Sequence, residues 1–372
     1  MSSPEDASAA KQSPLHECHL AAGAKFAAFS GWSMPLEYAD GGVLAEHAAV
    51  REAVGVFDVS HLGKATVAGP GARAYVNSVL TNDLDKINSG QAQYTMLCTP
   101  DGGVVDDLIA YLKSDDDVFL IPNAANTAAV VDVLAGGAPD GITVTNEHDD
   151  HVVIAVQGPR SDEVLSALDL PTDHDYMSFT TAEIAGAQVT VCRTGYTGER
   201  GYEIVAPTAA GVAVWQAVLA AGQPYGIRPA GLGARDTLRT EMGYALHGNE
   251  IAADMSPVEA RLGWAIGWKK DAFRGHEALR AEKAAGPART LRGLKATGRG
   301  IPRAGMIVVD ESGNEIGRVT SGTFSPTLRT GIALALVDTA VTEGPLLVQV
   351  RKRTEEFELT KPPFVTPGVR AS

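Results

Sequence analysis

The stretch Gly102–Tyr111 constrains the fold of this chain most, because two adjacent carboxylates interrupt an otherwise apolar run. The two glycines predict a turn, and the strand-forming residues after them predict a buried strand. Since side chains alternate across a strand, Asp106 and Asp107 must face opposite sides, Asp107 together with Ile109 and Tyr111. At least one carboxylate therefore faces apolar surroundings, which is costly unless it is paired, hydrogen-bonded or close to a polar ligand. The structural alternative is that both aspartates cap the turn or pair with a neighbouring arginine.

The length and charge of the chain limit the classes of function that need consideration. A chain of 372 residues predicts two or three domains. The net charge of −14, with no block of Lys or Arg, argues against a nucleic-acid partner and leaves room for a small anion held by local arginines. The first residues lack the features of a secretory signal, no apolar run is long enough to cross a bilayer, and three scattered cysteines make no disulfide framework. We expect a cytoplasmic protein.

Hydrophobic periodicity predicts an α+β fold with a separate C-terminal part. Residues 1–13 are expected to be a disordered leader, 30–38 an aromatic-rich loop in which a proline blocks a helix, and 43–54 a helix closed by Gly55. The predicted strands of the first part are 64–67, the hairpin 93–97 with 102–111, then 117–122, 152–156 and the hairpin 187–206, with helices after residues 71, 123, 212 and 231. A polar linker at about 270–288 is followed by short strands that predict a small all-β barrel or sandwich: 291–294, 306–309, 316–320, 332–337 and 346–350.

Three local patterns carry little functional weight. Residues 69–74 match G-x-G-x-x-A between a strand and a helix, but a proline lies between the glycines and no acidic strand end follows at the required distance, so a plain turn explains them. The cluster His16–His19 contains metal-ligand residue types without a second cluster, which favours a solvated helix start. Cys192 has no nearby histidine, so we do not expect a catalytic thiol.

A scattered set of polar side chains in apolar strands is more informative. Each one alone is most simply a hydrogen-bonded core residue. Together they would suit a flat heteroaromatic ligand with hydrogen-bonding edges and an anionic tail, because a glutamate can accept two hydrogen bonds from an amino-pyrimidinone and an arginine can hold a carboxylate. The members of this set are Tyr94, Asp107, Asn123, Tyr196, Glu203 and Arg235.

The order of several uninterrupted motifs closely resembles the aminomethyltransferase (T protein) family of the glycine cleavage system. The resemblance extends from about residue 14 to 367. The motifs that carry it are Gly31-Trp32-x-Met34-Pro35-Leu36, Gly55-Val56-Phe57-Asp58-Val59-Ser60-His61, Gly102-Gly103-Val104-Val105-Asp106-Asp107-Leu108, Gln157-Gly158-Pro159, Thr194-Gly195-Tyr196-Thr197-Gly198-Glu199, Gly231-Leu232-Gly233-Ala234-Arg235-Asp236-Thr237-Leu238-Arg239 and Thr320-Ser321-Gly322-Thr323-Phe324-Ser325-Pro326-Thr327.

This resemblance implies a fold, a co-substrate and a partner. It implies a folate-binding region over 14–272, made of two intertwined α+β domains, and a C-terminal β-barrel domain over 288–367. The three domains would form a ring around a central cavity that binds tetrahydrofolate. The donor would be the aminomethyl group on the lipoyl arm of the carrier H protein. The products would be 5,10-methylenetetrahydrofolate, ammonia and the dihydrolipoyl carrier.

The resemblance also implies residue roles. The second aspartate of the pair, Asp107, matches the essential aspartate of the family, and we expect it to orient the folate and ease proton movement. Leu62 stands where the family usually has methionine and keeps an apolar contact, and Ile109 and Tyr111 lie on the same strand face as Asp107. The other positions that match folate-binding residues are Tyr94, Asn123, Tyr196, Glu203, Arg235, Trp264 and Arg370.

Two related functions compete with the transferase. Relatives that serve iron–sulfur assembly without catalysis resemble Lys-Gly-Cys-Tyr-x-Gly-Gln-Glu around a key cysteine, and here Ala245 stands in the cysteine position. A folate-dependent demethylase acting on a methylated amine or sulfonium compound is the other alternative. The chain lacks the fused flavin domain of the amine oxidases, which leaves stand-alone demethylases as competitors.

Overall fold

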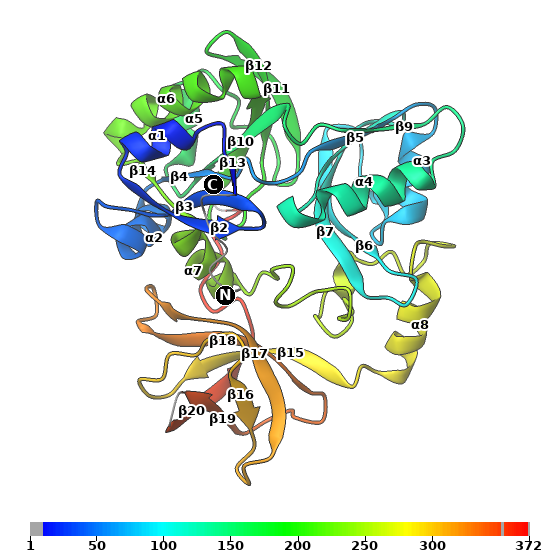
Figure 1. Ribbon diagram of the computed structural model, residues 1–372, viewed down its shortest axis with the longest axis vertical. Coiled ribbons are helices and arrows are strands. Elements are labelled where there is room, and N and C mark those ends of the chain that lie inside the picture. The colour runs from blue at the N-terminus through cyan, green and yellow to red at the C-terminus, as the bar shows by residue number, and fades with distance from the viewer. Residues whose placement is uncertain (1–9, 351–352, 371–372) are drawn as a thin grey trace.

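The computed structural model describes residues 10–350 and 353–370 and confirms the α+β fold with a C-terminal barrel. Two helix-flanked sheets lie in one half of the molecule and the barrel lies in the other (Figure 1). The nine leading residues of the predicted leader lie outside the described residues. Within the part that is described, no helix is long and apolar enough to cross a membrane.

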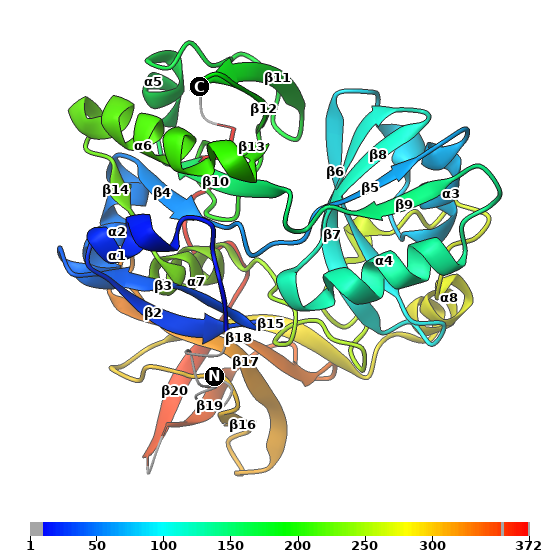
Figure 2. The same ribbon diagram turned by 45° about the horizontal axis from the view of Figure 1, so that its top comes forward.

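The first body is built on a six-stranded sheet with the order β11-β12-β13-β10-β4-β14. A three-stranded sheet of order β1-β3-β2 lies beside it (Figure 2). The strands are β1 (Lys11–Gln12), β2 (Ala24–Phe29), β3 (Trp32–Tyr38), β4 (Gly55–Asp58), β10 (His151–Gln157), β11 (Phe179–Ile184), β12 (Ala187–Cys192), β13 (Gly201–Pro207) and β14 (Arg228–Pro229). The helices are α1 (His16–Ala21), α2 (Gly42–Glu52), α5 (Ser161–Ser166) and α6 (Gly211–Gly222).

The second body is a five-stranded sheet of order β6-β7-β8-β5-β9. Its strands are β5 (Ala65–Ala68), β6 (Gln91–Cys98), β7 (Val104–Ser114), β8 (Asp117–Ile121) and β9 (Thr143–Asn146), and its helices are α3 (Ala72–Val79) and α4 (Thr127–Gly136). The chain enters this sheet after β4 and returns to the first body with β10, so the two bodies are connected twice. A shared core with Phe57 and Val153 from the first sheet and Tyr111 and Phe119 from the second joins them.

Strand β7 confirms the predicted alternation of the aspartate pair. Leu108 and Ala110 share the face of Asp106 and pack in the core beneath α3 and α4. Tyr111, on the face of Asp107, packs in the core that the two sheets share. The strand therefore directs one carboxylate into the interior of its own body and the other toward the junction between the bodies.

Helix α7 (Leu232–Met242) and a long irregular segment, 243–275, connect the sheets to the third body, and α8 (His276–Ala285) falls within the predicted polar linker. The third body is a closed six-stranded barrel of order β15-β18-β17-β16-β19-β20. Its strands are β15 (Arg289–Ala296), β16 (Ile307–Val309), β17 (Glu315–Ser325), β18 (Thr330–Asp338), β19 (Pro345–Val350) and β20 (Arg353–Thr360). Five of them match predicted strands, and β20 was not predicted.

Helix α7 also holds the barrel in place through buried charges. Arg239 donates to the Ser321 hydroxyl of β17 at 2.7 Å and forms an ion pair with Glu250 at 3.0 Å. Two residues further along the helix, Glu241 accepts hydrogen bonds from Ser325 and from the Thr327 hydroxyl at 3.0 Å. The family-like motifs at 231–239 and 320–327 thus meet in space as the joint between α7 and the barrel.

Several predictions near the N-terminus were wrong. Residues 11 and 12 of the predicted leader form β1, which pairs with Trp32 and Ser33. The predicted loop at 30–38 contains strand β3, and Pro35 is tolerated there because it lies opposite Phe26 at a bulge in the pairing with β2. Gly55 does not close the helix, since α2 ends at Glu52 and Gly55 begins β4.

The predicted solvated helix start at His16–His19 was also wrong for His19, which is fully buried. Its Nε2 lies 2.9 Å from the Asp58 carboxylate, and the Tyr38 hydroxyl lies 2.9 Å from its Nδ1. Ser13 donates to the same carboxylate. This network connects the N-terminal segment to β4, so Asp58 in the motif of residues 55–61 has a structural role.

Candidate active site

The Asp106–Asp107 pair lies where β7 meets the end of β8. Among the residues that the structure describes, neither aspartate is paired with an arginine, and their side chains bond to Tyr94, Asn123 and Asn126 instead of capping the turn. The Tyr94 hydroxyl of β6 donates to Asp107 Oδ2 at 3.0 Å, and Asn123 Nδ2 lies 2.7 Å from Asp107 Oδ1. Asp106 is completely buried and accepts from the Asn123 backbone N–H at 2.9 Å and from Asn126 Nδ2 at 2.7 Å. The structure thus brings together the predicted residues Tyr94, Asp107 and Asn123. Of the two aspartates, Asp107 keeps partial solvent access.

Burial dominates the acid–base properties of the pair. Burial, together with the charge of Asp107, raises the pKa of Asp106 to about 8. Burial also raises the pKa of Asp107, although hydrogen bonds from Tyr94 and Asn123 and the charge of His247 oppose that rise. Because two carboxyl groups this close do not ionise independently, the pair can hold a proton in a pH range where an ordinary aspartate cannot.

The turn before β7 fixes a second wall of the site. A Cβ at Gly103 would lie 1.8 Å from the Ala253 carbonyl oxygen, so only glycine allows the 243–275 segment to pack against this strand. The Val104 N–H donates to the Ala252 carbonyl at 2.8 Å, and His247 Nε2 lies 3.2 Å from the Val104 carbonyl. His247, which sequence reasoning missed, therefore enters the surroundings of Asp107 through packing and not through sequence proximity.

Trp264 lies beside the pair and is 67% exposed, the largest exposure among the exposed large hydrophobic side chains. Its indole stacks on the Tyr94 ring, with centroids 5.3 Å apart and an angle of 28° between the planes. An exposed indole stacked on the tyrosine that donates to Asp107 offers an apolar face to a flat ligand.

Strand β13 and the loop that precedes it supply further polar side chains. Glu203 is 8% exposed and accepts a hydrogen bond from the Thr194 hydroxyl. Burial raises the pKa of Glu203, while Thr194 and the charge of Arg235 oppose the rise. The Tyr196 hydroxyl donates to the Ala245 carbonyl, so this loop is also fixed to the 243–275 segment.

Arg235, at the start of α7, is the cation of the site. Its guanidinium lies over the Tyr196 ring, 4.5 Å from the centroid. It makes no hydrogen bond or ion pair with any residue in 10–350 or 353–370. Burial lowers its pKa from the ordinary value, although an arginine remains charged. A partly buried guanidinium without a protein acceptor is suited to bind an anionic group of a ligand.

The remaining predicted residues lie at the edges of this arrangement. Leu62 and Ile109 are half-buried against the shared core, and the Tyr111 hydroxyl lies 3.3 Å from the Thr194 hydroxyl. Arg370 is exposed on the C-terminal tail and lies over the Tyr176 ring at 5.6 Å. The structure therefore places Arg370 outside the immediate group around Asp107, although the tail that carries it is hydrogen-bonded to the β12–β13 loop through Gly368 and Gly198.

Three supporting residues were missed by sequence reasoning. Gln157, which is buried, donates to the Thr194 and Tyr202 carbonyls and accepts from Thr197, so it holds the β12–β13 loop. Thr194 and Asn126 contact Glu203 and Asp106 directly. Two sequence features could have indicated Gln157 and Asn126, because both lie at the end of a strand. They are the Gln157-Gly158-Pro159 motif at the end of β10 and the Asn-x-x-Asn spacing just after β8.

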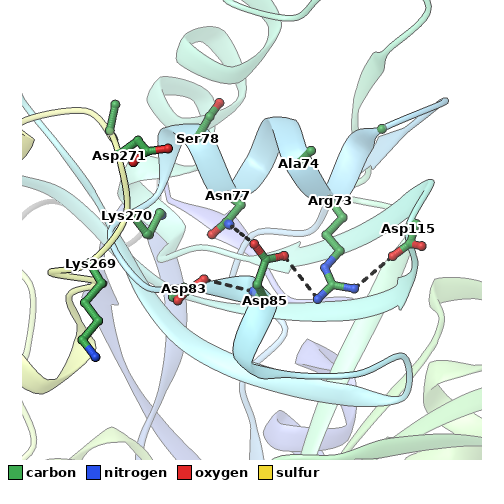
Figure 3. A pocket seen from close by; sticks show the side chains of 12 residues that line it. Arg73, Ala74, Asn77, Ser78, Asp83, Asp85, Asp115, Lys269, Lys270 and Asp271 are labelled. Carbon is green, nitrogen blue, oxygen red and sulfur yellow. Dashed lines mark hydrogen bonds and ion pairs between the residues drawn. The ribbon is translucent and has the colours of Figure 1, made fainter.

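Other polar features of the molecule do not form a second site of this kind. A groove of about 710 Å³ beside α3 contains charged side chains, but Arg73 is paired with Asp85 at 3.3 Å and Asp115 at 3.0 Å (Figure 3). At the G-x-G-x-x-A segment, Asp116 accepts a hydrogen bond from the Gly71 N–H at 2.9 Å. No group of three metal-ligating side chains occurs among the residues that the structure describes.

The fold and the site define a two-part protein, in which an α+β region that carries the aspartate pair is followed by a closed barrel. Residues 15–270 match the GCVT N-terminal domain, and residues 289–366 match the glycine cleavage T-protein C-terminal barrel domain. The chain belongs to the glycine cleavage T-protein family.

Known relatives cover the chain almost completely. The aminomethyltransferase of Parafrankia sp. strain EAN1pec is 59% identical over 361 residues, which cover 97% of this chain and 99% of the relative. That of Mycobacterium tuberculosis strain H37Rv is 57% identical over 362 residues, covering 96% and 97%. The crystal structure of glycine cleavage system aminomethyltransferase T from Bartonella henselae superposes with a TM-score of 0.90 at 36% identity, covering 96% of this chain and 98% of that one.

Proposed function

We propose that this chain is an aminomethyltransferase of the glycine cleavage system. It moves the one-carbon unit from the aminomethyl-dihydrolipoyl arm of the H protein to tetrahydrofolate. The observation that carries the proposal is the Asp107 carboxylate, which Tyr94 and Asn123 hold at the junction of the two sheet bodies while it keeps access to solvent. Identity above 55% to aminomethyltransferases over nearly the whole chain supports it. We place the reaction in the cytoplasm.

Tetrahydrofolate would occupy a central cavity among the three domains, which we propose to be arranged as a ring. The stacked Tyr94 and Trp264 rings would face the flat ring system. Glu203 would accept hydrogen bonds from the amino-pyrimidinone edge, since a carboxylate offers two acceptors in one plane. Arg235, whose guanidinium lies over the Tyr196 ring and forms no ion pair within residues 10–350 and 353–370, would hold a carboxylate of the glutamyl tail. Leu62, Ile109 and Tyr111 would line the apolar side, and Arg370 would meet the ligand from the C-terminal tail.

The reaction needs proton movement as well as positioning. Two folate nitrogens form bonds to the methylene carbon, while its bonds to the amine nitrogen and to the lipoyl sulfur break. The two protons that the folate nitrogens lose balance the protons that ammonia and the dihydrolipoyl thiol gain. Asp107 orients the folate and eases this movement, an effect of about 10²–10⁴-fold for general acid–base groups. Holding the lipoyl arm and the folate together would supply much of the remaining acceleration.

Reconstitution tests this function. Aminomethylated H protein and tetrahydrofolate are mixed with the purified chain, and the release of ammonia and the formation of methylenetetrahydrofolate are followed. We expect both products in equal amounts. Folate binding without either product would favour a non-catalytic relative, and one-carbon transfer from a methylated amine or sulfonium compound instead of the H protein would favour a demethylase.

A further inference from the structure

Within the part of the chain that is described, the side chain of Asp106, the aspartate without solvent access, hydrogen-bonds to Asn123 and Asn126. Its Oδ2 accepts the Asn123 backbone N–H at 2.9 Å. Its Oδ1 lies 2.9 Å from Asn123 Nδ2 and 2.7 Å from Asn126 Nδ2. The same Asn123 Nδ2 lies 2.7 Å from Asp107 Oδ1. One amide group therefore bridges the two carboxyl groups across the strand.

We propose that Asp106 is a positioning residue, which fixes the Asn123 side chain so that its amide nitrogen, and not its oxygen, faces Asp107. This inference rests on the proposed function, because it assigns the part of Asp106 in the work of Asp107. It also extends the family-like Asp-Asp motif by giving its buried member a task of its own.

The argument depends on the two ends of an amide having nearly the same shape and opposite hydrogen-bonding character. With its nitrogen forward, Asn123 donates to both aspartates, reaching Asp106 Oδ1 and, on Asp107, the carboxylate and the backbone carbonyl at 2.9 Å. With its oxygen forward, it would set an acceptor against Asp107 and weaken the hold on the carboxylate. The ionised Asp106 carboxylate adds to the preference that the Asp107 carbonyl also sets, because its Oδ2 accepts the backbone N–H of Asn123, a donor that cannot turn, and its Oδ1 therefore faces the amide. Asn126 occupies its other oxygen from outside the site.

The surroundings of Asp107 make this orientation consequential. The titratable groups that face it are Asp106 across its own strand, Tyr94 from β6, His247 from the 243–275 segment and Tyr196 from the β12–β13 loop. Tyr94 and Asn123 make the hydrogen bonds to its side chain. Losing the correct orientation of Asn123 therefore removes one of the two groups that hold the carboxylate in place.

The test is a kinetic cycle on the full-length protein. Asp106→Asn keeps the shape of the side chain but makes it a donor at every pH. The comparison is made above pH about 8, where the wild-type Asp106 is ionised and only accepts, so the change removes one of the acceptors that hold the Asn123 nitrogen in place. We expect kcat to fall about 10- to 100-fold while KM for tetrahydrofolate stays within about threefold, because the hold on a catalytic carboxylate and not ligand contact is lost. In an Asn123→Ala background the same change should lower kcat by less than about twofold. Asp101→Asn, an exposed aspartate in the preceding turn, is the matched control and should leave kcat unchanged.

Carboxyl-carbon NMR titration adds a readout that does not need turnover. The shared amide predicts that Asp107 titrates in two linked steps in the wild type and in one step in Asp106→Asn. An unchanged kcat in a folded Asp106→Asn variant overturns the inference. So does a fall in kcat on Asp106→Asn that is equally large in the wild-type and Asn123→Ala backgrounds. A single step in the wild type overturns it as well. A wild-type protein that releases no ammonia refutes the proposed function instead, and the titration then still decides the role of Asp106.

Discussion

Replacing Gly103 by alanine should disable the site without touching any ligand-binding side chain. The new Cβ would lie 1.8 Å from the Ala253 carbonyl oxygen, and real Cβ contacts are essentially never shorter than 3.0 Å. The 243–275 segment must therefore retreat by about 1.2 Å or more. That movement breaks the Val104 N–H hydrogen bond to Ala252 and displaces His247 from β7.

The size of the effect follows from these contacts. A buried backbone donor left without its partner costs about 1–3 kcal/mol, and the forced movement of packed backbone adds about 1–3 kcal/mol. We expect a fall in the free energy of unfolding of about 2–5 kcal/mol and a loss of kcat of at least about tenfold, since a displacement of 1 Å near a reacting group can cost about 10²-fold.

The assay combines thermal unfolding with ammonia release at a temperature where both proteins are folded. Gly136→Ala is the matched control, because a Cβ there meets nothing within 4 Å and Gly136 ends helix α4. That variant should be as stable as the wild type or slightly more so. A Gly103→Ala protein with the stability and kcat of Gly136→Ala would refute the reasoning, because the backbone approach at β7 would then have no consequence.

Three further predictions follow from named contacts. Asp107→Asn should lower kcat by about 10²–10⁴-fold, with single-turnover kinetics as the measurement; equal, mild losses in Asp107→Asn and Asp106→Asn would remove the special role of Asp107. Trp264→Ala should raise the Kd for tetrahydrofolate about 2- to 10-fold, as expected from the loss of an aromatic contact, and leave Tm nearly unchanged because the indole is exposed; fluorescence titration and a melting curve check both. Burial alone would raise the pKa of Glu241, but the hydrogen bond and charge of His47, with Ser325 and Arg51, lower it to about 2, so this group stabilises the fold above pH about 4.5 by about 3 kcal/mol and loses that contribution as the pH falls toward 2. Urea unfolding at several pH values between 5 and 3 should show a larger fall in the free energy of unfolding for the wild type than for Glu241→Gln. The same dependence on pH in both proteins would contradict this role of Glu241.

The sequence predicted those features that depend on neighbouring residues, such as the alternation of side chains along one strand. The alternation in β7 and the strand end before Asn123 were sufficient to expect a carboxylate in an unusual environment, and the structure provides one. The five predicted barrel strands are rich in apolar residues between turns, and β18 is an almost continuous buried run. Strand β20 was missed because half of the residues in Arg353–Thr360 are charged, and Phe357 is its fully buried side chain. Its place in the barrel depends on pairing with β15 and β19, which no local pattern encodes.

The misassigned residues share one physical cause, which is a partner distant in sequence. His19 is buried because Asp58, 39 positions away, receives it. Asn126 and Gln157 become visible as supporting residues only when the strand ends they follow are placed beside Asp106 and the β12–β13 loop. Arg235 could be predicted as a cation near the ligand, but the position of its guanidinium over the Tyr196 ring is a property of the assembled structure alone.

Helix α7 carries Arg235 at its first turn and Arg239 and Glu241 at its last, where the barrel is attached. A helix transmits displacement with little bending over so short a length, about 1.5 Å of rise per residue. The contacts between the barrel and the end of α7 therefore help to fix the orientation of the Arg235 guanidinium. A chain that ends before β15 would retain every proposed folate-binding residue except Arg370. It should nevertheless bind the anionic end of the ligand more weakly, because α7 would lose its contacts with the barrel.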